Sequence, residues 1–370
     1  MQQFLDCRKT WKLRWYDHLV RKYPDGKLFF GTLFHKHMEH WYRAGGERTA
    51  AAEATNAWIK EQKPEMMDQA DYRELMELFW PLVNQYMDYY EDDFNAITVL
   101  ATELQFAIPM YDEDQGMQSY AYSGTIDLVY KQDGLLKFRD YKTVSSIDRY
   151  VNNAVLDRQI SRYWWALTAL CDGYGYILQD EKWVPIQQHP LWDKLRGQAP
   201  DEFEYDIVRK DVAKPPKVIK KGAALSVDKS QNTTYELYVE ALKTHGFWDG
   251  DGPVPAAYVE VLEHLKQQGN KFLRRLPVRR RWSECEAAME DFHKAAVEMM
   301  DIRRMLNTRP KDVADKHLYW NINYDTKDMN QYYPLILAEV NGDNVSMVQA
   351  SLFEYEKDYD PESDYIEVEE

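Results

Sequence analysis

Hydrophobic and β-branched residues near the middle of the chain predict two strands joined by a tight turn. Residues 124–130 (GTIDLVY) combine β-branched and aromatic side chains, which favour extended backbone. The residues that follow, Gln132, Asp133 and Gly134, favour a turn, and residues 135–143 (LLKFRDYKT) resume the strand pattern. We therefore predict a β-hairpin over this stretch.

The segments on either side of the hairpin predict a mixed α/β domain. Helical patterns occupy residues 4–20, 31–92, 232–268 and 283–306, and a further helix should carry Gln159. Strand patterns occupy residues 97–110 and 173–179, whereas residues 180–230 are rich in turn residues and should form an irregular insertion. Two strands, a helix and another strand beside several helices indicate an α/β sandwich, with helices flanking a mixed central sheet.

Polar residues on the predicted hairpin suggest its chemistry. Asp140 and Lys142 are two positions apart, so on a strand they project from the same face. Asp127 lies on the partner strand and can reach the same end of the hairpin. Two carboxylates beside an amine suit one or two hard divalent cations, because Mg²⁺ prefers oxygen ligands and leaves room for a phosphate. This arrangement is typical of phosphodiester hydrolysis.

Four short motifs, in a specific chain order, resemble those of a nuclease family. They are Gly31-x-x-x-His35-x-x-x-Glu39, Gly124-x-x-Asp127, Asp140-x-Lys142 and Gln159-x-x-x-Tyr163. The spacing of four in the last motif places Gln159 and Tyr163 on one helix face, and Thr32 is a candidate cap for the helix that carries His35. Together the motifs resemble the PD-(D/E)xK nuclease superfamily, and in particular its RecB-like and phage exonuclease branch.

The resemblance implies a fold and a catalytic apparatus. It implies a restriction-endonuclease-like core with N-terminal helices over residues 1–179, completed by the helical and basic segment 231–310. The implied ligands of Mg²⁺ or Mn²⁺ are His35, Asp127, Asp140 and the backbone carbonyl of Tyr141, with Glu103 as an additional carboxylate. Lys142 would orient the attacking water, while Gln159 and Tyr163 would support that water or the DNA. The implied reaction is exonucleolytic DNA hydrolysis in phage or bacterial recombination or repair, which leaves 5′-phosphorylated ends.

Cysteine usage departs from this branch. A cysteine near the N-terminus, here Cys7, often joins three C-terminal cysteines around an iron–sulfur cluster in its members. The chain has only two others, Cys171 and Cys285, and residues 318–324 (LYWNINY) contain none. We therefore expect no iron–sulfur cluster, a degenerate cluster region over residues 311–353, and packing contacts as the clamp between the termini. So few cysteines also suggest a reducing cytoplasm.

Charge is distributed unevenly along the chain. The net charge of −16 is unexpected for a DNA enzyme, but clustering matters more than the sum. Residues 271–281 (KFLRRLPVRRR), beside Phe272 and Trp282, predict a strip that contacts DNA phosphates. Its cations are Lys271, Arg274, Arg275, Arg279, Arg280 and Arg281. Residues 354–370 hold nine acids and one lysine, which predicts a disordered tail.

Other functions and partners follow from the same residues. A nuclease-fold DNA-binding or helicase-partner subunit could keep the fold with dispensable catalysis. The cluster of His35, His37, Glu39 and His40 could instead bind zinc, although it lacks the H-E-x-x-H order and a cysteine partner. Because no Walker A loop occurs, unwinding would need a separate helicase, and a single-strand annealing protein is another expected partner. Without a signal peptide or an apolar run of about 18 residues, we expect no membrane association and a cytoplasmic location, that of the host if a phage encodes the protein.

Overall fold

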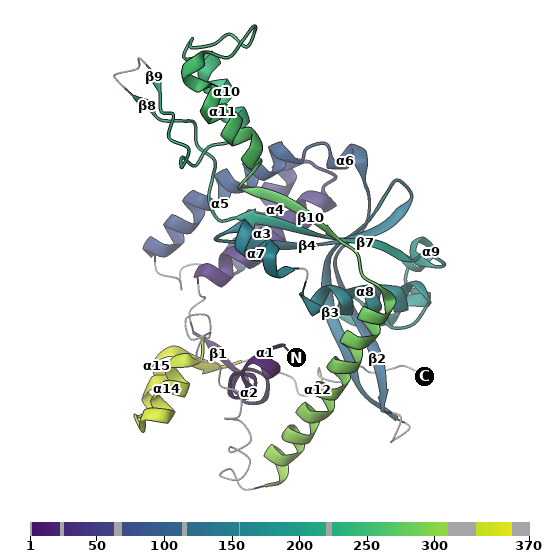
Figure 1. Ribbon diagram of the computed structural model, residues 1–370. Helices are drawn as coiled ribbons and strands as arrows, with labels where there is room; N and C mark the ends of the chain where they lie inside the picture. The colour runs from purple at the N-terminus through teal and green to yellow at the C-terminus, as the bar shows by residue number, and fades with distance from the viewer. Residues whose placement is uncertain are drawn as a thin grey trace.

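A seven-stranded mixed sheet forms the centre of the molecule (Figure 1). The computed structural model describes residues 2–22, 26–62, 69–112, 117–154, 156–219, 224–309 and 331–356. The strand order is β10-β7-β4-β3-β2-β5-β6, in which β4 and β7 are parallel and the other neighbours antiparallel. The strands are β2 (Thr98–Asp112), β3 (Met117–Gln132), β4 (Leu135–Val144), β5 (Tyr176–Gln179), β6 (Lys182–Pro185), β7 (Pro200–Arg209) and β10 (Leu273–Val278). The predicted α/β class with a mixed central sheet is confirmed.

The predicted hairpin is formed by β3 and β4 in the middle of this sheet. Asp133 and Gly134 have φ angles of 51° and 80°, as a two-residue type I′ turn requires. Consecutive β3 residues contribute to different cores: Leu128 packs in one hydrophobic cluster and Val129 in another. The period of two therefore buries the sheet on both faces.

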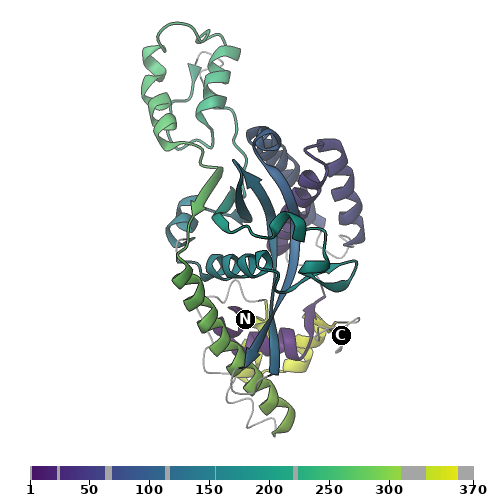
Figure 2. The same cartoon turned by 90° about the vertical axis from the view of Figure 1, so that its right-hand side faces the viewer.

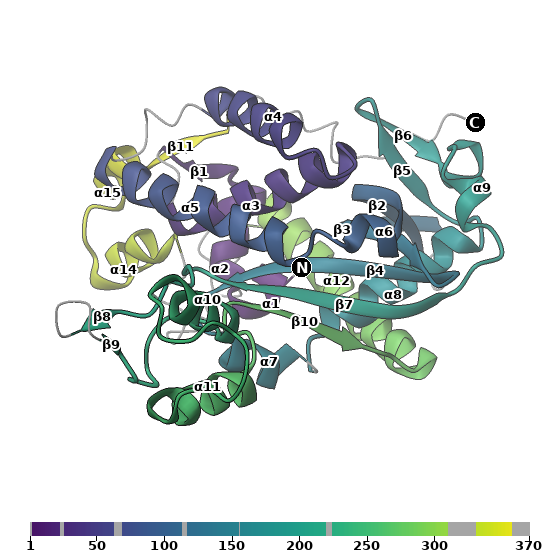
Figure 3. The same ribbon diagram turned by 90° about the horizontal axis from the view of Figure 1, so that it is seen from above.

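Helices cover both faces of the sheet (Figure 3). One face carries α3 (Gly26–Arg43), α4 (Arg48–Glu61), α5 (Gln69–Tyr89) and α6 (Asp93–Ala96). The other carries α7 (Ile147–Ala154), α8 (Arg158–Cys171) and α12 (Trp282–Thr308). Helix α8 buries Ile160, Trp164 and Leu167, whose spacing of four and three forms one apolar stripe against the sheet.

The predicted irregular insertion over residues 180–230 is wrong in its first half. Strand β7 pairs with both β4 and β10 inside the central sheet, and β6 and the short helix α9 (Trp192–Leu195) precede it. Acidic residues interrupt the apolar pattern of β7, which obscures it in the sequence. Phe203, Tyr205 and Ile207 nevertheless alternate along the strand and are all buried.

Two element boundaries also differ from the predictions. Thr32 lies inside α3, which begins at Gly26, so it does not cap that helix. Strand β5 begins at Tyr176, because Gly173 and Gly175 have positive φ angles and belong to the preceding turn.

The chain between β7 and β10 contains a small α-helical hairpin that projects from the sheet (Figure 2). It consists of α10 (Tyr235–Thr244) and α11 (Ala256–Gln268), preceded by the two-stranded β8 (Val218–Ile219) and β9 (Ala224–Leu225). Tyr238, Leu242 and Leu262 belong to a core of its own. The helical pattern predicted over residues 232–268 is confirmed, and it forms these two helices.

The two ends of the described chain are joined. The N-terminal part contains α1 (Gln2–Asp6), α2 (Arg8–Trp11), a π-helix (Lys12–Tyr16) and β1 (Leu19–Arg21), rather than the single helix predicted. The C-terminal part contains α14 (Tyr333–Asn341), α15 (Val345–Leu352) and β11 (Phe353–Tyr355). The helix pattern ends early because β1 pairs with β11.

Packing supports this clamp between the termini. Cys7 is buried in a cluster with Leu335 and Phe353, whereas Cys171 on α8 and Cys285 on α12 are buried in the core on one face of the central sheet. These contacts agree with the expectation that packing holds the ends together. Residues 318–324 and most of the acidic tail lie outside the described ranges.

Candidate active site

The candidate active site lies where β3 and β4 separate. The backbone pairing of these strands runs from the turn to Leu128 and Arg139. Beyond that point the Oδ2 atom of Asp127 accepts a hydrogen bond from the backbone N–H of Tyr141, at 2.7 Å. A side chain thus takes the place of a backbone hydrogen bond between the strands. We call the point where β3 and β4 separate, at Asp127 and Asp140, the fork.

Three ligand-type side chains converge at this fork from three elements. His35 on α3, Glu103 on β2 and Asp127 on β3 each offer one atom, and these atoms lie within 4.8 Å of one another. His35 Nδ1 is 3.2 Å from Asp127 Oδ2. One imidazole nitrogen and two carboxylates suit a divalent cation such as Mg²⁺ or Mn²⁺.

Glu103 has an unusual backbone conformation for a strand residue. Its φ is +47°, a left-handed value that carries steric strain in a non-glycine residue. The pairs on either side, Thr102 with Leu128 and Leu104 with Ile126, place Glu103 opposite Asp127. Burial and the nearby Asp127 charge raise the pKa of Glu103 to about 7. Strain and charge crowding at one position indicate a functional constraint.

Asp140 forms the other half of the site together with Lys142 and Gln159. It is 3% exposed, and Lys142 Nζ lies 2.5 Å from its Oδ2 atom. Gln159 Nε2 donates to Asp140 Oδ1 at 3.4 Å, and Lys142 donates to Gln159 Oε1 at 3.5 Å. Asp140 is not part of the group formed by His35, Glu103 and Asp127, so its role as a metal ligand stays a prediction.

Charges across the fork shift the pKa of its members. Burial alone would lower the pKa of His35, but its hydrogen bond to Asp127 and the neighbouring carboxylates outweigh burial and raise the pKa to about 9. Burial raises the pKa of Asp140 to about 6, with Lys142 opposing the shift and Asp127 adding to it. Burial would lower the pKa of Lys142, yet Asp140 raises it above its usual value. Lys142 is therefore an ammonium at any working pH.

The remaining motif residues surround this centre. Gly124 leaves space for Tyr163 and Phe106, because a Cβ atom there would lie 3.1 Å and 3.0 Å from their rings. The buried ring of Tyr141 packs edge-on against Phe34 and His35. The contribution of the Tyr141 carbonyl as a ligand stays a prediction.

The residues of the alternative zinc cluster are directed to different partners. His37 and His40 both place Nδ1 against the Thr55 hydroxyl, at 2.9 Å and 3.1 Å. His35 instead contacts Asp127, and Glu39 pairs with Lys36 and Arg43. Burial is the main cause that lowers the pKa of His37, to about 4. This geometry favours a structural role for His37 and His40.

The basic strip is only partly turned to solvent. Arg274, Arg279 and Arg281 are exposed, and Arg280 reaches the backbone carbonyl of Asp157 at 3.3 Å. Lys271 Nζ donates to the backbone carbonyl of Gln231.

Arg275 is wrongly predicted as a DNA contact. It points inward, pairs with Asp93 and Asp206, and lies 3.6 Å from the centre of the Tyr90 ring. The reason is the register of β10, whose alternate positions face opposite sides of the sheet. Phe272 is buried as well, whereas Trp282 is exposed.

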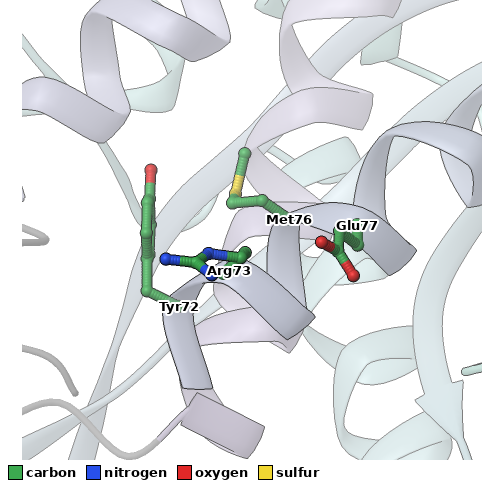
Figure 4. Close-up of a pocket in the computed structure, with 4 residues that line it drawn as sticks. All are labelled: Tyr72, Arg73, Met76 and Glu77. Atoms are coloured by element: carbon green, nitrogen blue, oxygen red, sulfur yellow. The ribbon is translucent and has the colours of Figure 1, made fainter. Parts of the chain in front are cut away.

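A surface pocket on α5 is unrelated to the fork. It is lined by Tyr72, Arg73, Met76 and Glu77 from successive turns of one helix (Figure 4). None of the candidate ligands or motif residues lines it.

Comparison with known protein families identifies the class to which this fold and this site belong. A family model of the PD-(D/E)XK nuclease superfamily matches residues 1–191, and the chain belongs to this superfamily. The match includes α3, the β3–β4 fork and α8, but not β7 or β10. Neither a curated protein nor a solved structure matches the chain. None of the helices in the described ranges has an apolar stretch long enough to cross a membrane.

Proposed function

We propose that the protein is a Mg²⁺- or Mn²⁺-dependent deoxyribonuclease of the RecB-like branch that degrades DNA from its ends. The observation that carries this proposal is the fork, where His35, Glu103 and Asp127 converge beside the Asp140–Lys142 pair. The superfamily is nucleolytic and uses divalent metals. Five residues of the motifs contact one another in pairs in this region, namely His35 with Asp127, and Asp140 with Lys142 and Gln159. A role in phage or bacterial recombination or repair, in the cytoplasm, fits this activity.

The residues on the two sides of the fork would have different roles in hydrolysis: one set would bind the metal ion and the other would stabilise the charge on the phosphate. His35, Glu103 and Asp127 would hold the cation, with Asp140 and the Tyr141 carbonyl as further ligands. A bound divalent cation supplies a Lewis acid and a lowered pKa for a coordinated water. Lys142 places a fixed positive charge beside Asp140, where it can stabilise charge that develops on the scissile phosphate. Gln159 contacts both groups through hydrogen bonds, and Tyr163, one turn further along α8, would support the attacking water or the DNA with it.

A comparison of linear and closed circular DNA tests the proposed activity. We expect the wild-type protein to degrade end-labelled linear DNA with Mg²⁺ or Mn²⁺, to leave covalently closed circles intact, and to do nothing in EDTA. Cutting of the circle would make the protein an endonuclease. DNA binding without cleavage of either substrate would contradict the enzyme and favour a DNA-binding or helicase-partner subunit. Addition of a separate helicase or annealing protein would then test those partners.

The exposed arginines Arg279 and Arg281, between β10 and α12, predict a second result. We expect Arg279→Ala combined with Arg281→Ala to weaken DNA binding and to reduce the slope of log Kd against log salt concentration by about 2. Each phosphate contact that is lost means about one counterion fewer released from the DNA on binding. Fluorescence anisotropy with labelled DNA at several salt concentrations measures this slope. The control is Arg304→Ala, which removes an exposed arginine near the C-terminal end of α12. Equal slopes in all three proteins would place the DNA elsewhere.

A further inference from the structure

A layer of contacts lies directly behind Lys142 and Gln159. Tyr205 on β7 is the ladder partner of Asp140 on β4, so the two side chains project from the same face of the sheet. The Tyr205 side chain is 1% exposed, and Lys142 Nζ lies 5.9 Å from the centre of its ring. Phe203 and Tyr150 pack edge-on around this ring. The ring therefore forms a rigid floor beneath the ammonium group.

The hydroxyl of Tyr205 connects this floor to the helix that carries Gln159. It donates to Asp157 Oδ2 at 2.6 Å. Asp157 is the N-cap of α8, and its Oδ1 atom accepts the backbone N–H of Gln159 at 2.8 Å. One carboxylate thus binds both the strand beside Asp140 and the first turn of α8.

We propose that Tyr205 and Asp157 are positioning residues of the active site, which hold Lys142 and Gln159 in register around Asp140. The inference rests on the proposed nuclease function. Lys142 and Gln159 have long side chains that lose rotamer freedom when they are held in one geometry. The ring of Tyr205 restricts the first, and the cap from Asp157 fixes the start of the helix that carries the second.

In Tyr205 and in Asp157, one polar atom takes no part in the ring packing or in the helix cap. A phenylalanine would fill the space of Tyr205 between Phe203 and Tyr150, whereas the hydroxyl adds the hydrogen bond to Asp157 and also interacts with the Tyr150 hydroxyl. A serine would cap α8 through one oxygen, so the second carboxylate oxygen of Asp157 serves only Tyr205. These two atoms, the Tyr205 hydroxyl and Asp157 Oδ2, form a hydrogen bond that joins β7 to the N-terminus of α8 next to the reacting groups.

Tyr205→Phe tests this inference, because it keeps the ring and removes only the hydroxyl. We expect kcat for DNA cleavage to fall about tenfold with KM changed less than about twofold, as for the loss of one hydrogen bond that aligns the site. Tyr238→Phe is the matched control, since it removes a buried hydroxyl that donates to the Ser226 carbonyl at 2.9 Å in the projecting hairpin. Its kcat should equal that of the wild type.

A double variant separates positioning from general stability. If Tyr205 acts through Gln159, Tyr205→Phe combined with Gln159→Ala should cleave no more slowly than Gln159→Ala alone. Asp157→Ser, which keeps a cap, should reproduce Tyr205→Phe. A wild-type kcat in Tyr205→Phe, or losses that multiply in the double variant, would overturn the inference while leaving the nuclease intact. A wild-type protein that cleaves no DNA would overturn both.

Discussion

Lys142→Ala should lower the rate of DNA cleavage by roughly a thousandfold, the loss expected when a preorganised charge is removed from a phosphoryl-transfer site. Lys142 is the cation held directly against Asp140, and it stays charged because Asp140 raises its pKa. Single-turnover cleavage of end-labelled linear DNA with Mn²⁺ measures the rate without interference from product release.

A lysine on the same strand provides the matched control. Lys137 also lies on β4 and pairs with Glu202 at 2.9 Å, at the end of the strand near the turn. Lys137→Ala removes the same side chain from the same strand and should cleave at the wild-type rate. Comparable losses in both variants would mean that β4 is damaged as a whole, and an active Lys142→Ala would contradict the assigned role.

Arg139→Ala should reduce the free energy of unfolding by about 3–5 kcal/mol, because it leaves Arg275 to compensate the buried carboxylates that the two arginines now share. Arg139 is 2% exposed and contacts Glu204 at 2.7 Å and Asp93 at 3.1 Å. Its guanidinium joins α6, β4 and β7, so its loss affects three elements together. Urea unfolding followed by circular dichroism measures the change.

The control for this variant is a surface ion pair. The Arg48 side chain is 41% exposed and pairs with Asp88 between α4 and α5, where solvent screens the interaction. Arg48→Ala should cost less than about 1 kcal/mol. A similar small cost for Arg139→Ala would show that the buried carboxylates find other partners or become protonated without a large penalty.

Local patterns account for the parts of the fold that the sequence predicts well. The β3–β4 hairpin follows from a two-residue Asp-Gly turn between strand patterns, and α12 follows from a long amphipathic repeat. The spacing within each motif also predicts which residues share a face. The structure brings His35, Asp127, Asp140, Lys142 and Gln159 into one region, as the motif order indicates.

Long-range pairing explains what the sequence does not predict. Strand β7 carries acidic residues that resemble a loop, but Glu204 and Asp206 bind Arg139 and Arg275 inside the sheet. Arg275 belongs to a basic run, and only the register of β10 reveals that it points inward. The strained backbone of Glu103 likewise depends on the opposite strand rather than on neighbouring residues.

The most direct test of the central claim is to measure Mn²⁺ binding and DNA cleavage side by side for the wild type and Lys142→Ala. Calorimetry gives the metal affinity, and end-labelled linear DNA gives the rate at each Mn²⁺ concentration. We expect both proteins to bind Mn²⁺, and only the wild type to cleave, with a rate that saturates as the metal site fills. Cleavage that persists in EDTA, or equal cleavage by both proteins, would contradict a metal-dependent nuclease at the β3–β4 fork.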